Sequence, residues 1–157
     1  PPAVLETVEL RALARGVVAE QAAIAAARDL DLGLLPGATV SVAGNPAELR
    51  TLLSNLVDNA LRYTPAGGQI DVGVDCEGAA AVLSVRDTGP GIAPAERARV
   101  FDRFYRGAAG TSVPGSGLGL AIVQHIADRH QARITLDDAA PGLRITVRFA
   151  QAAQTDA

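Results

Sequence analysis

Lysine is absent from the 157-residue sequence, so all 14 of its basic residues are arginine. A Walker-A phosphate loop, a Schiff-base enzyme and a typical protein-kinase site each depend on a lysine amine. The absence of lysine therefore excludes these three kinds of catalytic site.

Cysteine and aromatic residues are scarce as well. Cys76 is the single cysteine, which excludes an internal disulfide and a thiolate metal cluster. It falls on the apolar side of an alternating segment, so we expect its thiol to point into the core as a small hydrophobe. Aromatic residues make up 3% of the chain, so the core must consist of leucine, valine, isoleucine and alanine.

Charge and hydropathy limit the partners and the location. The net charge is −3 and the arginines are scattered, which predicts neither nucleic-acid binding nor an anionic membrane surface. No apolar run approaches membrane-spanning length, and the first ten residues do not resemble a signal peptide. We therefore expect one soluble domain from a reducing compartment, long enough to bury a core.

Residues 49–64 predict the central helix of the fold. Asn45 is a capping residue, Pro46 suits the first helical position, and Glu48 occupies the capping-box position. The apolar positions that recur at helical spacing are Leu49, Leu52, Leu53, Leu56, Val57 and Ala60.

A polar stripe runs along the same helix. Asn55, Asn59 and Arg62 are spaced at i, i+4 and i+7, and asparagine is a poor residue for a helix interior. Two interpretations remain open: a polar site beside the buried face, or two asparagines that are merely exposed.

The remaining elements indicate a two-layer α/β sandwich. This α+β fold has a mixed, mostly antiparallel sheet covered on one face by three helices. The two other long helices are expected at residues 10–28 and 118–129, and a short helix is expected at 94–100. Strands are expected at residues 31–36 and 39–43, paired through a turn at Pro36-Gly37, and at 70–77 and 80–86 as a hairpin. The last strands are expected at 133–136 and 143–149, joined by a turn at Pro141-Gly142.

Glycine forms two clusters that are candidate ligand contacts. The first contains Gly89 and Gly91 after a strand, and the second contains Gly115, Gly117 and Gly119 before a helix. The second cluster is not a dinucleotide fingerprint, because no strand precedes it and its third glycine comes one residue early. Free N–H groups at the start of the following helix are suited to phosphate oxygens.

Four segments taken together are more specific than any of them alone. NLVDNALRYT, DTGPGI, FDRFYRG and GSGLGLAIV, in this order, resemble the ATP-binding catalytic domain of bacterial two-component sensor histidine kinases. That domain belongs to the superfamily that also contains DNA gyrase, Hsp90 and MutL. The resemblance covers residues 8–150 and implies a Bergerat-type fold, with residues 1–150 as a single catalytic domain and 151–157 as a frayed tail.

The resemblance also implies roles for individual residues. Asn59 and Asn55 would bind Mg²⁺, and Asp87 would accept a hydrogen bond from the adenine amino group. The other implied nucleotide contacts are Arg62, Tyr63, Gly89, Gly91, Ile92 and Leu120. The implied phosphate loop consists of Gly115, Ser116, Gly117, Leu118 and Gly119.

A lid over the nucleotide is implied at residues 108–114. Phe101 and Phe104 would anchor it, and Arg103 or Arg106 would stabilise charge on the γ-phosphate during transfer. Rival interpretations are that Tyr63 and the two phenylalanines only pack in the core.

Further alternatives concern the remaining charged and histidine residues. The rival interpretation of Arg103 is an ion pair with a carboxylate such as Asp102 or Glu96. His125 and His130 are expected not to be phosphoacceptors, because the family's acceptor histidine lies on a separate upstream hairpin, which this sequence lacks.

The sequence departs from the family pattern at several positions. Gln131-Ala132 replaces a common Gly-Gly pair, and the late Gly-x-Gly-Thr is reduced to residues 141–144, which puts turn geometry in doubt more than activity. Asn55 stands where the gyrase-like and Hsp90-like members carry a glutamate general base. An amide cannot take a proton from water, so we expect slow hydrolysis and transfer to an external side chain.

Three hypotheses of function follow from the resemblance. The first is transfer of the γ-phosphoryl group of Mg-ATP to a histidine on a dimerisation hairpin, with a response regulator downstream. The others are an anti-sigma-factor-type serine kinase and a non-catalytic nucleotide-binding module. The first hypothesis implies a monomeric fragment from the cytoplasmic part of an inner- or plasma-membrane receptor.

Overall fold

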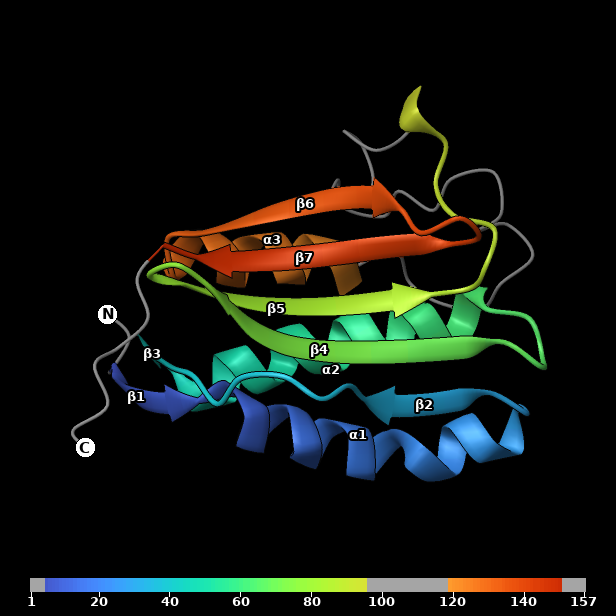
Figure 1. Cartoon of the computed structure of the whole chain (residues 1–157), viewed down its shortest axis with the longest axis horizontal. Helices are drawn as coiled ribbons and strands as arrows, with labels where there is room; N and C mark the ends of the chain where they lie inside the picture. The colour runs from blue at the N-terminus through green and yellow to red at the C-terminus, as the bar shows by residue number, and fades with distance from the viewer. Residues whose placement is uncertain (1–4, 96–118, 151–157) are drawn as a thin grey trace.

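The computed structural model describes residues 5–95 and 119–150, which form one layer of strands and one layer of helices (Figure 1). The helices are α1 (Leu10–Ala27), α2 (Pro46–Tyr63) and α3 (Gly119–Arg129). The strands are β1 (Glu6–Glu9), β2 (Asp31–Leu34), β3 (Ser41–Gly44), β4 (Gln69–Glu77), β5 (Ala80–Asp87), β6 (Ala132–Asp138) and β7 (Leu143–Phe149). The predicted fold class is confirmed.

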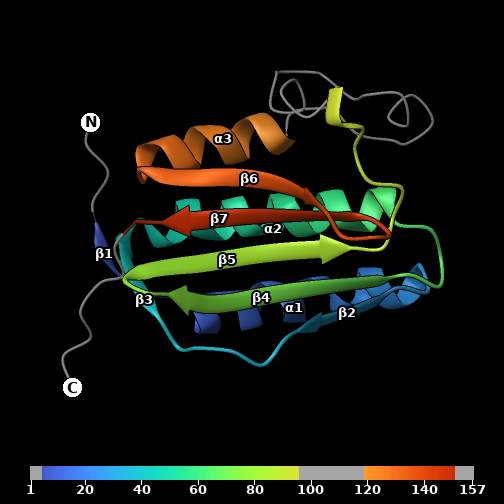
Figure 2. The same ribbon diagram turned by 45° about the horizontal axis from the view of Figure 1, so that its top comes forward.

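The main sheet has five strands in the order β2-β4-β5-β7-β6, and β1 and β3 form a separate two-stranded sheet. The pairing of β2 with β4 is parallel, and the other pairings are antiparallel. All three helices lie on one face of the main sheet, with α2 between α1 and α3 (Figure 2). No helix among the described residues covers the opposite face of the main sheet, called the open face below.

Helix α2 begins where its capping signals predict. The Glu48 N–H donates to Asn45 Oδ1 over 3.0 Å, and Pro46 is the first helical residue. The predicted apolar face is buried, with Leu49, Leu52 and Leu53 fully shielded from solvent. Burial of about seven such side chains is the main stabilisation of a helix of this length.

Alternation along the strands divides the sheet into a core face and an open face. On β4, Ile70 and Val72 are buried toward the helices, whereas Asp71 and Gly73 belong to the open face. The register of β5 places Asp87 on the core side, opposite Ile70. The next residue back along the strand, Arg86, therefore lies on the open face.

The predicted pairing of the two short strands before α2 is wrong. Residues 31–36 and 39–43 do not pair with each other, because β2 pairs with β4 and β3 pairs with β1. Arg11 of α1 binds the connection between them and ties it to β4. Its guanidinium donates to the carbonyl oxygens of Leu35 (3.0 Å), Ala38 (2.9 Å) and Val74 (3.0 Å). A guanidinium fork from another element is a non-local contact that no turn signal reveals.

Cys76 is exposed, which corrects the prediction that its thiol points into the core. The alternation that buries Val72 and Val74 ends before Cys76, which lies two residues from the β4–β5 turn at Gly78. Strand periodicity indicates the face of a residue, but the helices decide how far along the strand that face is covered.

The remaining elements agree with the sequence as far as they are described. Of the helix expected at 94–100, only Pro94 and Ala95 belong to the described residues, and they form a single tight turn. Residue Leu118, the expected start of α3, lies outside the described residues, and the described helix begins at Gly119. In the described part of the chain, no helix has the length and apolarity to cross a membrane.

Candidate functional site

The candidate site lies at the end of the main sheet where β5, the end of α2 and the β6–β7 turn meet (Figure 2). Asp87 is the last residue of β5 and is 7% exposed. Its Oδ1 accepts the Gly89 N–H over 2.9 Å. Burial raises the pKa of Asp87, and backbone hydrogen bonds from Gly89 and Leu143 and the charge of Arg86 oppose that rise.

Glycines allow the three segments around Asp87 to approach one another. A Cβ atom on Gly89 would lie 2.8 Å from the Tyr63 carbonyl oxygen, which is closer than a side chain tolerates. Gly142 has a φ of 98°, and its Cβ would lie 1.8 Å from the carbonyl oxygen of Asp87. Gly91 contacts Gly142 from the other side, with 3.1 Å between the Cβ position of Gly91 and the Gly142 carbonyl oxygen.

The predicted polar stripe on α2 is only partly exposed. Asn55 and Asn59 are half-buried, and within residues 5–95 and 119–150 neither side-chain amide has a hydrogen-bond partner. Arg62 is exposed and forms an ion pair with Asp58, with 3.1 Å between Nε and Oδ2. The two amides thus keep their full capacity to act as oxygen ligands.

The structure brings some of the predicted contacts together and leaves others outside. Asp87 and Gly89 contact each other, and Gly89 packs against the backbone of Tyr63, whose side chain is half-buried. Ile92 is partly buried against the core, and Leu120 of α3 is buried. The predicted residues outside the described part of the chain are Phe101, Arg103, Phe104, Arg106, the lid at 108–114, Gly115, Ser116, Gly117 and Leu118.

Sequence reasoning missed two features of this site. Gly142 was expected only as a turn residue, although its contact with Asp87 and its positive φ make it part of the site. The hydroxyl of Thr64, directly after α2, is buried and has no hydrogen-bond partner in the described part of the chain. The Pro141-Gly142 turn signal gives the position of the turn, but not its contact with a strand far away in sequence.

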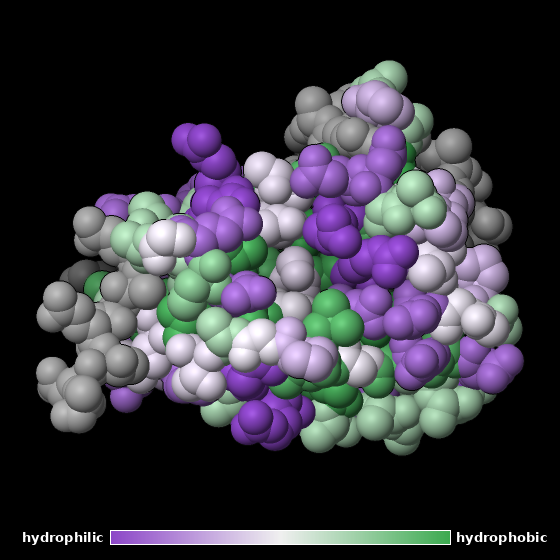
Figure 3. Space-filling view, viewed as in Figure 1, coloured by the Kyte–Doolittle hydropathy of each residue, from purple (hydrophilic) through white to green (hydrophobic). Residues whose placement is uncertain are grey.

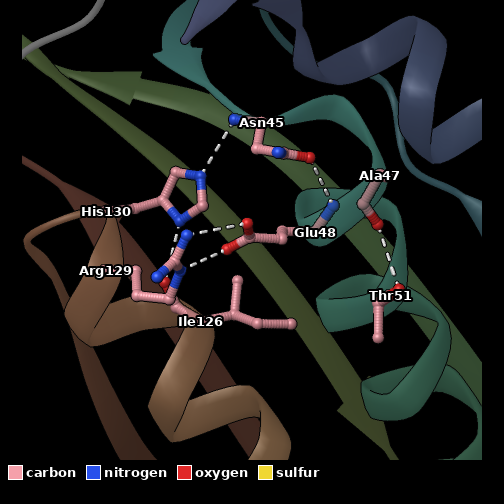
Figure 4. Close-up of polar contacts among 7 residues, drawn as sticks. All are labelled: Asn45, Ala47, Glu48, Thr51, Ile126, Arg129 and His130. Atoms are coloured by element: carbon pink, nitrogen blue, oxygen red, sulfur yellow. Dashed lines mark hydrogen bonds and ion pairs between the residues drawn. The ribbon is translucent and has the colours of Figure 1, made fainter. Parts of the chain in front are cut away.

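His130 joins the end of α3 to the start of α2 (Figure 4). The Asn45 N–H donates to His130 Nε2 over 3.1 Å, and His130 Nδ1 lies 2.8 Å from the Ile126 carbonyl oxygen. Nε2 thus acts as a hydrogen-bond acceptor, while Nδ1 faces a carbonyl oxygen, which can only accept. His130 thus has a structural role, and its exclusion as a phosphoacceptor stays a prediction.

An ion pair beside His130 ties the same two helices together. Arg129 Nε and Nη2 lie 2.8 Å and 3.2 Å from the Glu48 carboxylate oxygens (Figure 4). The hydrogen bond and the charge of Arg129 lower the pKa of Glu48. His125 is exposed on α3, and its exclusion as a phosphoacceptor stays a prediction.

Comparison with protein families gives the class of this fold and site. Residues 44–153 match the family described as histidine kinase-, DNA gyrase B- and HSP90-like ATPase. The matched region contains α2, the Asp87 segment, α3 and the last two strands. The chain therefore belongs to this family of ATPase domains.

Relatives within the family are sensor kinases. The chain is 44% identical to the sensor protein kinase PmrB of Pseudomonas aeruginosa, over 96% of this chain and 31% of PmrB. It is 37% identical to the phosphate regulon sensor protein PhoR of the same organism, over 96% of this chain and 34% of PhoR. The chain spans about a third of the length of these relatives, in which this family's domain is the catalytic, ATP-binding one.

Solved structures of histidine kinases share the fold. The mycobacterial sensor histidine kinase MprB is 31% identical with a TM-score of 0.82, over 97% of this chain and 100% of that one. The ATP-binding domain of PrrB from Mycobacterium tuberculosis is 27% identical with a TM-score of 0.78, over 94% and 98% of the two chains. Full-length ShkA in complex with AMPPNP is 25% identical with a TM-score of 0.86, over 98% and 32%.

Proposed function

We propose that this domain binds Mg-ATP and donates the γ-phosphoryl group to a histidine on a separate dimerisation and phosphoacceptor domain. The observation that carries the proposal is the buried carboxylate of Asp87, held at the end of β5 beside glycine backbone. An apolar-walled cleft with a few fixed polar groups is the usual way to orient a small ligand. The structure of ShkA with AMPPNP supports an adenine nucleotide as that ligand.

Asp87 would select adenine over guanine. An ionised carboxylate only accepts hydrogen bonds, so it pairs with the adenine amino group and is repelled by the guanine carbonyl at the same position. Glycine at positions 89 and 91 lets the backbone of Tyr63 and of the β6–β7 turn pack closely around this carboxylate, which holds it in place.

The two asparagines of α2 fit a magnesium ion. Mg²⁺ prefers oxygen ligands and takes few of them from the protein, because it keeps water and phosphate oxygens. The amides of Asn55 and Asn59 are half-buried and have no competing hydrogen bond within the described part of the chain. When bound, the ion would neutralise phosphate charge, while the asparagines orient it.

Transfer would depend on positioning and charge neutralisation rather than on a base in this domain. We assign phosphate binding to the segment 115–119 and charge stabilisation at the γ-phosphate to Arg103 or Arg106. Asn55 cannot deprotonate water, so the phosphoryl group is kept for an acceptor that carries its own nucleophilic nitrogen. The acceptor histidine would be on the hairpin of the parent receptor, and a response regulator would take the group next.

Calorimetric titration tests the nucleotide assignment. The chain is titrated with ATP, with and without Mg²⁺, then with GTP, and the ATP titration is repeated with Asp87→Asn. We expect saturable binding of ATP but not GTP, strengthened by Mg²⁺ and weakened by Asp87→Asn. A folded chain that binds no ATP under any of these conditions would contradict the proposal.

Incubation with ATP and a dimerisation hairpin from a related kinase tests the transfer step. We expect an acid-labile phosphohistidine on the hairpin. An acid-stable phosphoserine on a partner would support the serine-kinase alternative instead. ATP binding without transfer to any competent hairpin would favour a non-catalytic module.

A further inference from the structure

A polar network crosses the open face of the sheet directly behind the candidate site. Arg86 follows the core-facing Val85 and precedes Asp87, so its side chain is on the face opposite the carboxylate. Its Nη1 lies 3.4 Å from Asp71 Oδ2, and its Nη2 donates to the Ala139 carbonyl oxygen over 3.4 Å. Gln69 Nε2 donates to the other oxygen of Asp71 over 2.9 Å.

Both ends of this network reach segments that surround Asp87. Ala139 is in the β6–β7 turn, where its N–H donates to the Gly142 carbonyl oxygen over 3.1 Å. The same turn carries Gly142, which abuts the backbone of Asp87, and Leu143, whose N–H donates to the Asp87 carboxylate.

At the other end, Gln69 pairs with Thr88, the residue after Asp87. The Gln69 N–H donates to Thr88 Oγ1 over 2.9 Å, and the Thr88 N–H donates to the Gln69 carbonyl oxygen over 3.2 Å. Arg86 thus connects β4, β5 and the β6–β7 turn next to the Asp87 carboxylate.

Burial distinguishes this network from an ordinary surface ion pair. Asp71 is only 9% exposed, although it is on the open face. Charges shielded from water interact more strongly and are screened less by salt than exposed ones. Hydrophilic residues of this face are visible in Figure 3 over the end of the sheet that carries Asp87, on the right, and also over its other end.

We propose that Arg86 is a positioning residue for nucleotide selection: from the open face it holds the β6–β7 turn and β4 in the arrangement that orients the Asp87 carboxylate. The inference rests on the proposed function, because it assumes that Asp87 contacts the base. Arg86 does not touch the ligand and acts through Asp87, Gly142 and Leu143.

The same face contains a matched control. Arg148 of β7 binds Glu77, with 2.8 Å between Nη2 and Oε2, beside the β4–β5 turn at the far end of the sheet. It has the same charge as Arg86 and lies on the same face, and the acidic partners of both arginines, Glu77 and Asp71, are on β4. Glu77, however, is not near Asp87. Arg148→Gln therefore removes an arginine from this face without disturbing the site.

The experiment compares ATP affinity across pH for the wild-type chain, Arg86→Gln and Arg148→Gln. We expect Arg86→Gln to raise the ATP Kd about tenfold, the low end of the effect of residues that orient a metal ligand through another group. Arg148→Gln should leave the Kd unchanged.

The pH profile gives a readout that a merely structural role would not change. Among the described residues, Arg86 is the charged group that lowers the pKa of Asp87. ATP affinity should fall at low pH as Asp87 is protonated, and this fall is called the acidic limb of the profile. In Arg86→Gln the acidic limb should move to higher pH, and in Arg148→Gln it should stay in place.

Arg86→Lys keeps the proposal testable if Arg86→Gln fails to fold. Lysine keeps the charge but cannot reach Asp71 and Ala139 with one planar fork. We expect a raised Kd with an unshifted acidic limb. Equal affinities and equal pH limbs in the Arg86 and Arg148 variants would overturn the inference, whereas a wild-type chain without ATP binding would overturn the proposed function itself.

Discussion

The Asp87 carboxylate is buried, and its ionised form has opposite effects on folding stability and on ligand binding. Burial penalises the ionised carboxylate and raises its pKa, while recognition of an amino group needs that ionised form. The Gly89 and Leu143 N–H groups reduce the conflict, because both hydrogen bonds favour the anion. Under the proposed function, the site therefore gives up some folding stability for selectivity between bases.

The raised pKa of Asp87 predicts a pH-dependent difference between the wild type and Asp87→Asn. A carboxyl group with a raised folded-state pKa binds its proton more tightly when folded, so the wild type loses stability as pH rises from the unfolded-state pKa through the folded-state pKa. Asp87→Asn has no such loss. Urea unfolding at several pH values between 3 and 7 should therefore show the variant gaining on the wild type as pH rises, roughly levelling off above the folded-state pKa.

The hydrogen bonds changed by the amide add an offset to this comparison that does not depend on pH. The slope against pH is therefore the informative quantity. A difference in unfolding free energy that stays constant, or that changes in favour of the wild type as pH rises, would contradict the raised pKa.

Gly142 predicts a large effect for a small substitution. A Cβ on Gly142 would overlap the Asp87 carbonyl oxygen at 1.8 Å, and its φ of 98° is unfavourable for any L side chain. Gly142→Ala should lower both the unfolding free energy and ATP affinity, as measured by urea unfolding and calorimetry. The matched control is Gly78→Ala, which also has a positive φ but open space around it, and which should cost only about 1–2 kcal/mol.

The comparison of these two glycines separates strain from steric overlap. Equal losses of stability in the two variants would mean that the close approach of the β6–β7 turn to β5 is not needed. A clear excess for Gly142→Ala, together with weaker ATP binding, would support the turn as part of the site.

At the scale of elements, local signals explain what was predictable. The Asn45 cap, the Pro46 start and the leucine spacing are all properties of neighbouring residues, and α2 forms where they indicate. The pairing of β2 and β3 failed because a guanidinium from α1 holds their connection, a contact across more than twenty residues. Burial at strand ends, as for Cys76, likewise depends on which helix covers the strand.

The candidate site follows the same division. Asp87, Asn55 and Asn59 could be proposed from the sequence, because they lie in segments whose order resembles a family, and their roles stay predictions. Arg86 and Gly142 were not, because their contacts with Ala139 and with the Asp87 backbone are made only once β5 and β7 pair. A sequence shows which chemical groups a residue carries, whereas the residue's neighbours in space depend on how the strands pair.

The hydrogen bond from the Asn45 N–H to His130 Nε2 forms a clasp between α2 and α3. Removing the His130 side chain should therefore lower the free energy of unfolding. His130→Ala would leave the Asn45 N–H, which begins the central helix, without its acceptor. Leaving a partly buried donor unsatisfied costs about 1–3 kcal/mol, so urea unfolding should show a loss in that range. His125→Ala is the control, because His125 is exposed on the same helix and should be close to neutral.

If His130→Ala were no less stable than His125→Ala, the clasp would have no energetic role.

At the scale of the whole molecule, a ligand that binds only the folded state must stabilise every element of it. The proposed contacts come from α2, the β5 end and α3, so nucleotide would link both layers of the sandwich. A ligand present at 100 times its Kd adds about 2.7 kcal/mol to the unfolding free energy. For a domain of this size, each kcal/mol shifts the melting temperature by about 2–4 °C.

Mg-ATP at saturating concentration should therefore raise the melting temperature by roughly 5–10 °C, as measured by thermal unfolding. GTP at the same concentration should give no shift, because the base would be repelled by Asp87. Asp87→Asn tests the origin of the shift: its own melting temperature sets the baseline, and ATP should move it little. An equal shift with ATP and GTP would mean that the phosphates alone hold the nucleotide, and that the carboxylate at the end of β5 does not read the base.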